Sequence, residues 1–211
     1  MHISEGVLST PILIGGGVLT VLGLSIGLKK IDYDRVMEVS ILASTFFVAS
    51  LIHVPLGPGS VHLILNGLLG MVLGWASFPA IFIALLLQAF FFQYGGLVVL
   101  GVNTFNMAAP AVLCFYLFGP LVSPLVKDPQ RRALAGFAGG FFSVFFSGIL
   151  MSSALALSDS GFFSIAQMVV AAHLPVMIIE GFITMFTVSF LAKIKPEILQ
   201  SYRSVDKLVQ I

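Results

Sequence analysis

The first thirty residues, MHISEGVLSTPILIGGGVLTVLGLSIGLKK (residues 1–30), decide how the rest of the chain is arranged. The acidic Glu5 precedes an apolar run at residues 7–28, and the basic pair Lys29-Lys30 follows it. The run is long enough to cross a bilayer core, which requires about 20 residues. A signal peptide carries its positive charge before the apolar run, so this order predicts a retained membrane span. Because lysine and arginine favour the cytoplasmic side, the N-terminus is expected outside.

Composition places the whole chain in the membrane. Of its 211 residues, 58% are hydrophobic and 9% are charged, whereas about 25% of the residues of an ordinary soluble domain are charged. These values exclude a soluble globule and predict a polytopic membrane protein in contact with the lipid bilayer, with no nucleic-acid partner. The one cysteine, Cys114, rules out an internal disulfide and a cysteine-rich metal site.

The other apolar runs and the basic residues predict the topology. Six further spans are expected at residues 36–53, 61–75, 80–93, 107–126, 133–157 and 165–192. The glycine-rich stretch 95–106 is expected to be an external or re-entrant loop. With seven spans, all ten lysines and arginines fall on one side, in segments 29–35, 127–132 and 193–211. The prediction is an all-α protein with seven transmembrane helices, one membrane domain (residues 1–192) and a cytoplasmic C-terminal tail (193–211).

The segment before the first span, residues 1–6, has the donors of a small chelator. The terminal amine of Met1, the main-chain nitrogen of His2 and a ring nitrogen of His2 can all reach one metal ion. Binding through the main-chain nitrogen requires loss of its proton, and the planar, nitrogen-rich coordination that results points to Ni(II) or Cu(II). The fourth ligand has to come from elsewhere in the chain.

Two other histidines are candidates for the fourth ligand. His62 follows a Gly-Pro-Gly-Ser turn at the outer end of the third expected span, at the right depth to complete the chelate. A histidine there can equally be an ordinary helix-end residue at the membrane interface. His53, at the outer end of the second expected span, is the competing ligand, or it hydrogen-bonds the turn. Glu5 gives the outer mouth negative charge that attracts cations, and with His53 it is expected to support or gate the site.

His173 and Glu180 form a second candidate site, as an intramembrane polar pair. They lie seven residues apart on one face of the seventh expected span. Ionisable groups at such depth are costly and usually face a polar interior or each other. Their role stays open between a structural hydrogen bond and a part in transport.

Two glycine pairs have the spacing that lets helices approach closely in lipid. Gly23 and Gly27 in the first span are a candidate face for contact with a partner protein, with internal packing as the alternative. Gly70 and Gly74 in the third span are expected to pack within the protein's own helix bundle.

Four stretches of the sequence resemble the CbiM/NikM family: residues 1–6 (MHISEG), 57–63 (GPGSVHL), 95–107 (GGLVVLGVNTFNM) and 173–181 (HLPVMIIEG). That family comprises the substrate-binding integral membrane components of energy-coupling factor transporters for cobalt and nickel. The resemblance extends from residue 1 to about residue 192. It implies a seven-helix, multi-pass protein of the prokaryotic cytoplasmic membrane.

The resemblance also implies a ligand set. The ion would be held by the amine of Met1, the main-chain and ring nitrogens of His2, and His62. Asn103 and Asn106 would lie in a loop over the ion and orient its ligands.

The chain departs from the family pattern in one place. Many members have a histidine and two threonines around the double glycine, where this chain has Gln93-Tyr94 and Val98-Val99. The sequence therefore leaves open the choice between Ni(II) and Co(II) as the transported substrate. No organic cofactor is expected.

The energy source must lie in other proteins. The chain lacks a G-x-x-x-x-G-K-[ST] phosphate loop, so it is not expected to be an enzyme and ATP hydrolysis is expected only in partner subunits. The resemblance implies a transmembrane coupling protein, two cytoplasmic ATPase subunits and a small accessory membrane protein. An alternative function from another class is a proton-coupled carrier or intramembrane enzyme that acts through His173 and Glu180, with an inert N-terminus.

Overall fold

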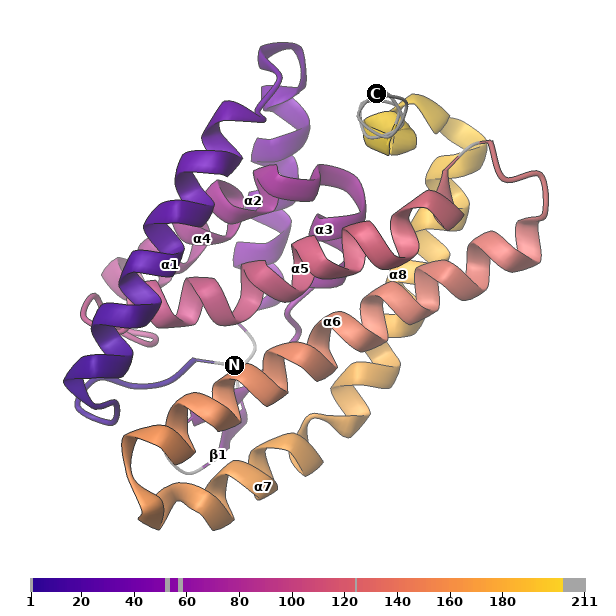
Figure 1. Cartoon of the computed structure of the whole chain (residues 1–211). Coiled ribbons are helices and arrows are strands. Elements are labelled where there is room, and N and C mark those ends of the chain that lie inside the picture. The colour runs from indigo at the N-terminus through magenta and orange to yellow at the C-terminus, as the bar shows by residue number, and fades with distance from the viewer. Residues whose placement is uncertain (1, 52–53, 57–58, 124, 203–211) are drawn as a thin grey trace, which may run out of the picture.

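The computed structural model describes residues 2–51, 54–56, 59–123 and 125–202. Its α-helices are α1 Thr10–Lys29, α2 Val36–Ala49, α3 Asn66–Leu73, α4 Ser77–Phe92, α5 Leu100–Val122, α6 Pro129–Ser158, α7 Phe163–Ala172 and α8 Leu174–Ile194. Short 3-10 helices lie at η1 Tyr33–Arg35, η2 Gly74–Ala76, η3 Ser160–Phe162 and η4 Pro196–Tyr202. Two three-residue strands, β1 Val54–Leu56 and β2 Gly59–Val61, form an antiparallel hairpin. Figure 1 shows α5 and α6 side by side through the middle of the molecule.

Among the residues that the structure describes, five helical runs are long and apolar enough to cross a membrane: Thr10–Lys29, Asn66–Phe92, Leu100–Val122, Pro129–Ser158 and Ser160–Ile194. They confirm a helical, multi-pass membrane protein. The seven separate spans expected from the sequence are not confirmed. The second expected span corresponds to α2, which has 14 residues, fewer than the roughly 20 that a bilayer core requires. The third and fourth expected spans fall in one apolar run, made of α3, η2 and α4.

Gly74 interrupts that run, close to the boundary expected from the sequence. Its φ of 56° and ψ of −124° end α3, in a conformation that glycine adopts at little cost. A Cβ atom at Gly74 would lie 3.0 Å from the ring of Phe115, and one at Gly70 would meet the main chain of Ala111. The predicted internal packing of Gly70 and Gly74 is confirmed, because both bring α3 against α5.

The loop prediction for residues 95–106 is wrong from Leu100 onward, because α5 begins there and includes Asn103 and Asn106. Gly101, the glycine in the helical part of this stretch, allows α5 to pack closely against α1. A Cβ atom at Gly101 would lie 2.8 Å from the Cα atom of Gly17 on α1, and the Thr20 hydroxyl donates a hydrogen bond to the Gly101 carbonyl at 2.5 Å. Small residues allow this close approach of two helices in lipid.

Gly23 and Gly27 also pack inside the chain. Both are buried, and a Cβ atom at Gly27 would lie 2.6 Å from the carbonyl oxygen of Trp75. A Cβ atom at Gly23 would overlap the ring of Phe78. The prediction that these two glycines form a partner-contact face is therefore wrong, and the alternative of internal packing is correct.

The seventh expected span, residues 165–192, is two helices with a junction at His173. Pro175 lies at the start of α8, where its missing N–H costs no helical hydrogen bond. His173 is therefore at a helix boundary, whereas the sequence placed it inside a continuous helix.

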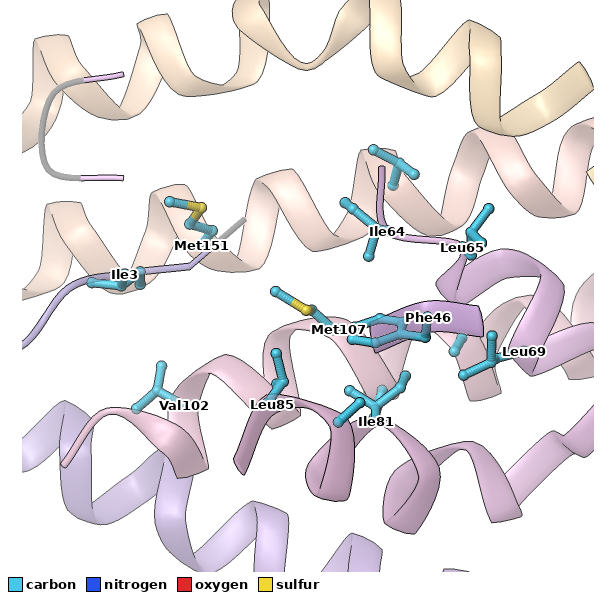
Figure 2. Close-up of a cluster of buried hydrophobic side chains, with 14 of the residues drawn as sticks. Ile3, Phe46, Ile64, Leu65, Leu69, Ile81, Leu85, Val102, Met107 and Met151 are labelled. Atoms are coloured by element: carbon cyan, nitrogen blue, oxygen red, sulfur yellow. The ribbon is translucent and has the colours of Figure 1, made fainter. Parts of the chain in front are cut away.

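The main hydrophobic core joins the N-terminal segment to the helices. Figure 2 shows Ile3 beside Met151 of α6, and Phe46 of α2 among Leu69, Ile81 and Met107. Ile3, Phe46, Met107 and Met151 are all at most 1% exposed. Burial of a large apolar side chain such as isoleucine contributes about 1.5–3 kcal/mol to the free energy of unfolding, so the buried side chain of Ile3 holds the N-terminal segment against the helix bundle.

The described part of the C-terminal tail packs onto the helices. Leu199 of η4 is fully buried in a second apolar cluster with Val188 of α8. The Arg35 guanidinium donates a hydrogen bond to the Ile198 carbonyl at 3.0 Å. This bond brings two of the three basic segments together at one end of the molecule, where Figure 1 shows the α1–α2 connection and the end of α8.

Candidate metal centre

A side chain of α5 fixes the N-terminal segment through the main chain of Ile3. The Ile3 N–H donates to Asn103 Oδ1 at 3.0 Å, and Asn103 Nδ2 donates to the Ile3 carbonyl at 3.0 Å. One amide side chain thus satisfies both buried main-chain groups, as a neighbouring strand would. Because Ile3 is held on both edges, His2 has a defined place next to it.

His2 and His62 meet in the interior. Their side chains are 4% and 3% exposed, their rings stack with centroids 4.7 Å apart at 30°, and Nδ1 of His2 lies 3.0 Å from Nε2 of His62. The two imidazoles come from the chain start and from the residue after β2. The structure therefore brings together two of the predicted metal ligands.

The surroundings of His62 fix its tautomer. Its Nδ1 atom lies 2.7 Å from the carbonyl oxygen of Leu63, and a carbonyl can only accept a hydrogen bond. Nδ1 therefore carries the proton and Nε2 has the lone pair. His2 Nδ1–H then donates to His62 Nε2, so the two nitrogens share one proton.

The double glycine after α4 lies directly against this pair. Gly95 has a φ of 75°, and a Cβ atom there would lie 3.0 Å from Asn103 Nδ2 and 3.5 Å from Cδ2 of His2. Gly96, with a φ of 126°, leaves room for the side chain of Glu5. Glu5 Oε1 accepts a hydrogen bond from the Val98 N–H at 2.9 Å. The stretch that was expected to cover the site thus touches it through its first two glycines.

Other predicted site residues lie apart from the pair or outside the described part. Asn106 is 5% exposed, and its Nδ2 atom has no hydrogen-bond partner among the described residues. Met1 and His53 lie outside the described residues, so their expected roles stay predictions. Among the residues that the structure describes, no group of three or more His, Cys, Asp or Glu side chains could hold a metal ion. An ion bound between His2 and His62 therefore requires donors of another kind.

His173 and Glu180 do not bond to each other. His173 Nδ1 donates to the Val169 carbonyl at 2.6 Å. Glu180 Oε1 accepts from the main-chain N–H groups of Ile64 and Leu65 at 2.5 and 2.9 Å. Each buried side chain is hydrogen-bonded to its own main-chain partners. This corresponds to a structural role, one of the two alternatives that the sequence left open.

Sequence reasoning missed two contacts around the histidine pair. One is the double hydrogen bond from Asn103 to Ile3, and the other is the bond from Glu180 to the segment after His62. Buried polar residues on otherwise apolar helices were the available signal, because such groups need hydrogen-bond partners. Nothing in the sequence identified those partners as main-chain groups about a hundred residues away.

The fold and the buried histidine pair define a multi-pass membrane protein with nitrogen donors near its amino end. Residues 2–198 match the family model described as "Cobalt uptake substrate-specific transmembrane region". The chain belongs to this family, CbiM, whose members are membrane components of cobalt and nickel transport.

Individual relatives agree with this assignment. A putative metal transport protein of Haemophilus influenzae is 46% identical over 94% of this chain and 97% of its own length. A putative fused nickel transport protein NikMN of Archaeoglobus fulgidus is 26% identical over 99% of this chain and 71% of its own length. A crystal structure of a transition metal transporter superposes with a TM-score of 0.79 at 29% identity, covering 96% of this chain and 99% of that one.

Proposed function

We propose that this chain is the substrate-binding component of an ATP-driven energy-coupling factor transporter and captures Ni(II) or Co(II) at the outer membrane face. The ligands are the Met1 amine, the main-chain nitrogen of His2, His2 Nδ1 and His62 Nε2. The observation that carries the proposal is the 3.0 Å separation of the two ring nitrogens.

That separation suits two neighbouring ligands of a planar ion. If the metal–nitrogen distances are like the roughly 2.0–2.1 Å of zinc–histidine bonds, adjacent corners of a square are about 2.8–3.0 Å apart, whereas corners of a tetrahedron are about 3.3–3.4 Å apart. In a chelate that runs from the amine through the main-chain nitrogen to His2 Nδ1, the vacant corner is next to Nδ1. His62 Nε2 lies at the distance that this corner requires.

Metal capture requires the proton between the two histidines to move. In the metal-free protein the Nδ1 proton of His2 lies between the two rings. A divalent ion takes the lone pairs of both nitrogens once this proton has moved from Nδ1 to Nε2 of His2, which leaves the ring neutral, and the proton released to solvent is that of the His2 main-chain N–H. The hydrogen bond of His62 Nδ1–H to Leu63 already presents Nε2 in the form that binds metal.

Transport requires further proteins. The chain has no phosphate loop, so a transmembrane coupling protein and two cytoplasmic ATPase subunits drive the cycle, with a small accessory membrane protein beside them. Seven spans put the N-terminus outside and the basic segments in the cytoplasm. The bond between Arg35 and the Ile198 carbonyl supports a common side for two of those segments.

The alternative function, a carrier or enzyme acting through His173 and Glu180, has less support. Both side chains are at most 1% exposed and are engaged by main-chain groups. By contrast, the N-terminal segment is anchored by the two hydrogen bonds between the main chain of Ile3 and the side chain of Asn103.

A metal-competition titration tests the proposal. Purified protein with a native N-terminus is titrated with nickel, cobalt, copper and zinc against a chromogenic chelator. High-affinity nickel or cobalt binding is expected, with loss in His2→Ala and in a chain whose Met1 amine is acetylated. Acetylation leaves every side chain intact and removes only the amine as a donor. Unchanged affinity in both variants would contradict the proposal.

A further inference from the structure

Glu180 is connected to His62 through a single peptide group. Oε1 of Glu180 accepts the Ile64 N–H at 2.5 Å, and the carbonyl of the same peptide, that of Leu63, accepts His62 Nδ1–H at 2.7 Å. The order of contacts is carboxyl of Glu180, peptide 63–64, imidazole of His62, and then His2 Nδ1. All of these contacts are made by buried groups or by the main chain beside them.

The peptide group transmits orientation because it is planar. When its N–H edge is held by Glu180, the direction of its carbonyl edge is set as well. That carbonyl determines which nitrogen of His62 carries the proton and how the ring is turned. Carboxylate partners of metal-binding histidines perform this task directly in many proteins; here a peptide lies between the two.

The segment needs an external anchor. Leu65 has a φ of 54°, a left-handed conformation that is unfavourable for a residue with a Cβ atom. It precedes α3 as an N-cap residue without a side-chain hydrogen bond. The second hydrogen bond of Glu180 Oε1, from the Leu65 N–H at 2.9 Å, holds this residue. One carboxyl oxygen on α8 thus fixes two successive residues between His62 and α3.

We propose that Glu180 is a positioning residue of the metal site, which acts through peptide 63–64 to orient His62 and to hold the proton on its Nδ1 atom. The proposal rests on metal capture by His2 and His62. The carboxyl also polarises the peptide, because hydrogen bonds in a chain strengthen one another, and this makes His62 Nε2 a better donor to the ion.

The first readout needs no metal. ¹⁵N NMR of the His62 ring in the metal-free protein reports the tautomer, which is expected to be the Nδ1–H form. In Glu180→Ala the ring is expected to populate both tautomers. Thr184→Val is the matched control, since Thr184 lies one turn further along α8, is fully buried and has no hydrogen bond to the His62 segment. The control should keep the Nδ1–H form.

The second readout is nickel affinity. Loss of an outer partner of a metal ligand typically weakens binding about 10–100-fold, and that range is expected for Glu180→Ala. Glu180→Gln keeps an acceptor oxygen and the side-chain shape, so it should fold, keep the tautomer and lose less affinity than Glu180→Ala. Thr184→Val should bind nickel like the parent chain.

The outcomes separate this inference from the proposed function. If the parent chain binds no nickel, but its Nδ1–H tautomer of His62 is lost in Glu180→Ala, the result supports the connection from Glu180 to His62 and contradicts metal capture. If the parent chain binds nickel, and Glu180→Ala leaves both the His62 tautomer and the nickel affinity unchanged, the result supports metal capture and overturns the positioning role of Glu180. If Glu180→Ala does not fold, Glu180→Leu takes its place, because leucine has a similar volume and no acceptor; an unchanged His62 tautomer together with parent-like nickel affinity in Glu180→Leu would overturn the positioning role.

Discussion

His2 Nδ1 and His62 Nε2 lie 3.0 Å apart although sixty positions separate the two residues in the sequence. Both rings are almost completely buried, and the chain start is held by hydrogen bonds to Asn103. A buried pair of nitrogens at this distance can bind a cation only after the proton between them has moved to another nitrogen, here from Nδ1 to Nε2 of His2.

Replacing His62 removes a ligand. In His62→Ala the remaining donors leave one corner of the ion to water, so nickel affinity should fall by more than the factor of about 100 that outer partners reach. Isothermal titration calorimetry measures the nickel affinity. His173→Ala is the control, because that imidazole bonds to Val169 and not to the pair. Equal losses in the two variants would indicate a general loss of folding.

Asn103 is expected to matter through the main chain. Asn103→Ala leaves the buried N–H and carbonyl of Ile3 without these partners, which should cost about 1–3 kcal/mol of unfolding free energy and about 10–100-fold in nickel affinity. Thermal unfolding in detergent and metal titration test the two effects. Asn106→Ala lies on the same helix, but Asn106 Nδ2 has no hydrogen-bond partner among the described residues, so this variant should have a smaller effect on both. The reverse ranking would refute the role given to Asn103.

Gly95 is expected to be intolerant of any side chain. Gly95→Ala combines a left-handed backbone, which costs about 1–2 kcal/mol for a residue with a Cβ atom, with a contact 3.0 Å from Asn103 Nδ2. Gly6→Ala is matched in backbone, with a φ of 80°, but its Cβ would meet nothing within 4 Å. Nickel affinity should therefore fall in Gly95→Ala and stay near the parent value in Gly6→Ala. The same affinity in both variants would show that Gly95 does not shape the site.

Nickel affinity should rise with pH. A metal-bound main-chain nitrogen has lost its proton, so at least one proton is released on binding at every pH in the usual range. One released proton makes the affinity rise about tenfold per pH unit, and the slope should be steeper at low pH, where the amine and imidazoles are also protonated. Competition titrations between pH 6 and 9 measure the slope. A flat dependence above pH 8 would exclude the main-chain nitrogen as a ligand.

The sequence predicted His62, with His53 as the competing ligand, as the partner of His2, because donor type is readable from the sequence and the charge pattern predicts one membrane side for all three. The chelating segment consists of adjacent residues, and the basic residues 29–35 predict the side on which it lies. Glu180 was recognised as a polar residue in an apolar span and Asn103 as part of a loop over the site, but their partners are main-chain groups that only the folded chain brings to them.

The errors in the predicted fold have a common physical cause. Glycines in stretch 95–106 suggested a loop, whereas Gly101 in fact allows α5 to pack on α1. Gly23 and Gly27 suggested a partner surface but face Trp75 and Phe78 of the same chain. In lipid, small residues mark close helix contacts, and the sequence alone does not specify which helix makes the contact.

The most direct test of the account is an anomalous difference map at the nickel absorption edge from crystals of the nickel-loaded protein. The account predicts one strong peak about 2.0–2.1 Å from both His2 Nδ1 and His62 Nε2, with the amine of Met1 and the main-chain nitrogen of His2 completing a plane. A peak elsewhere, with the His2 and His62 rings still hydrogen-bonded to each other, would contradict it.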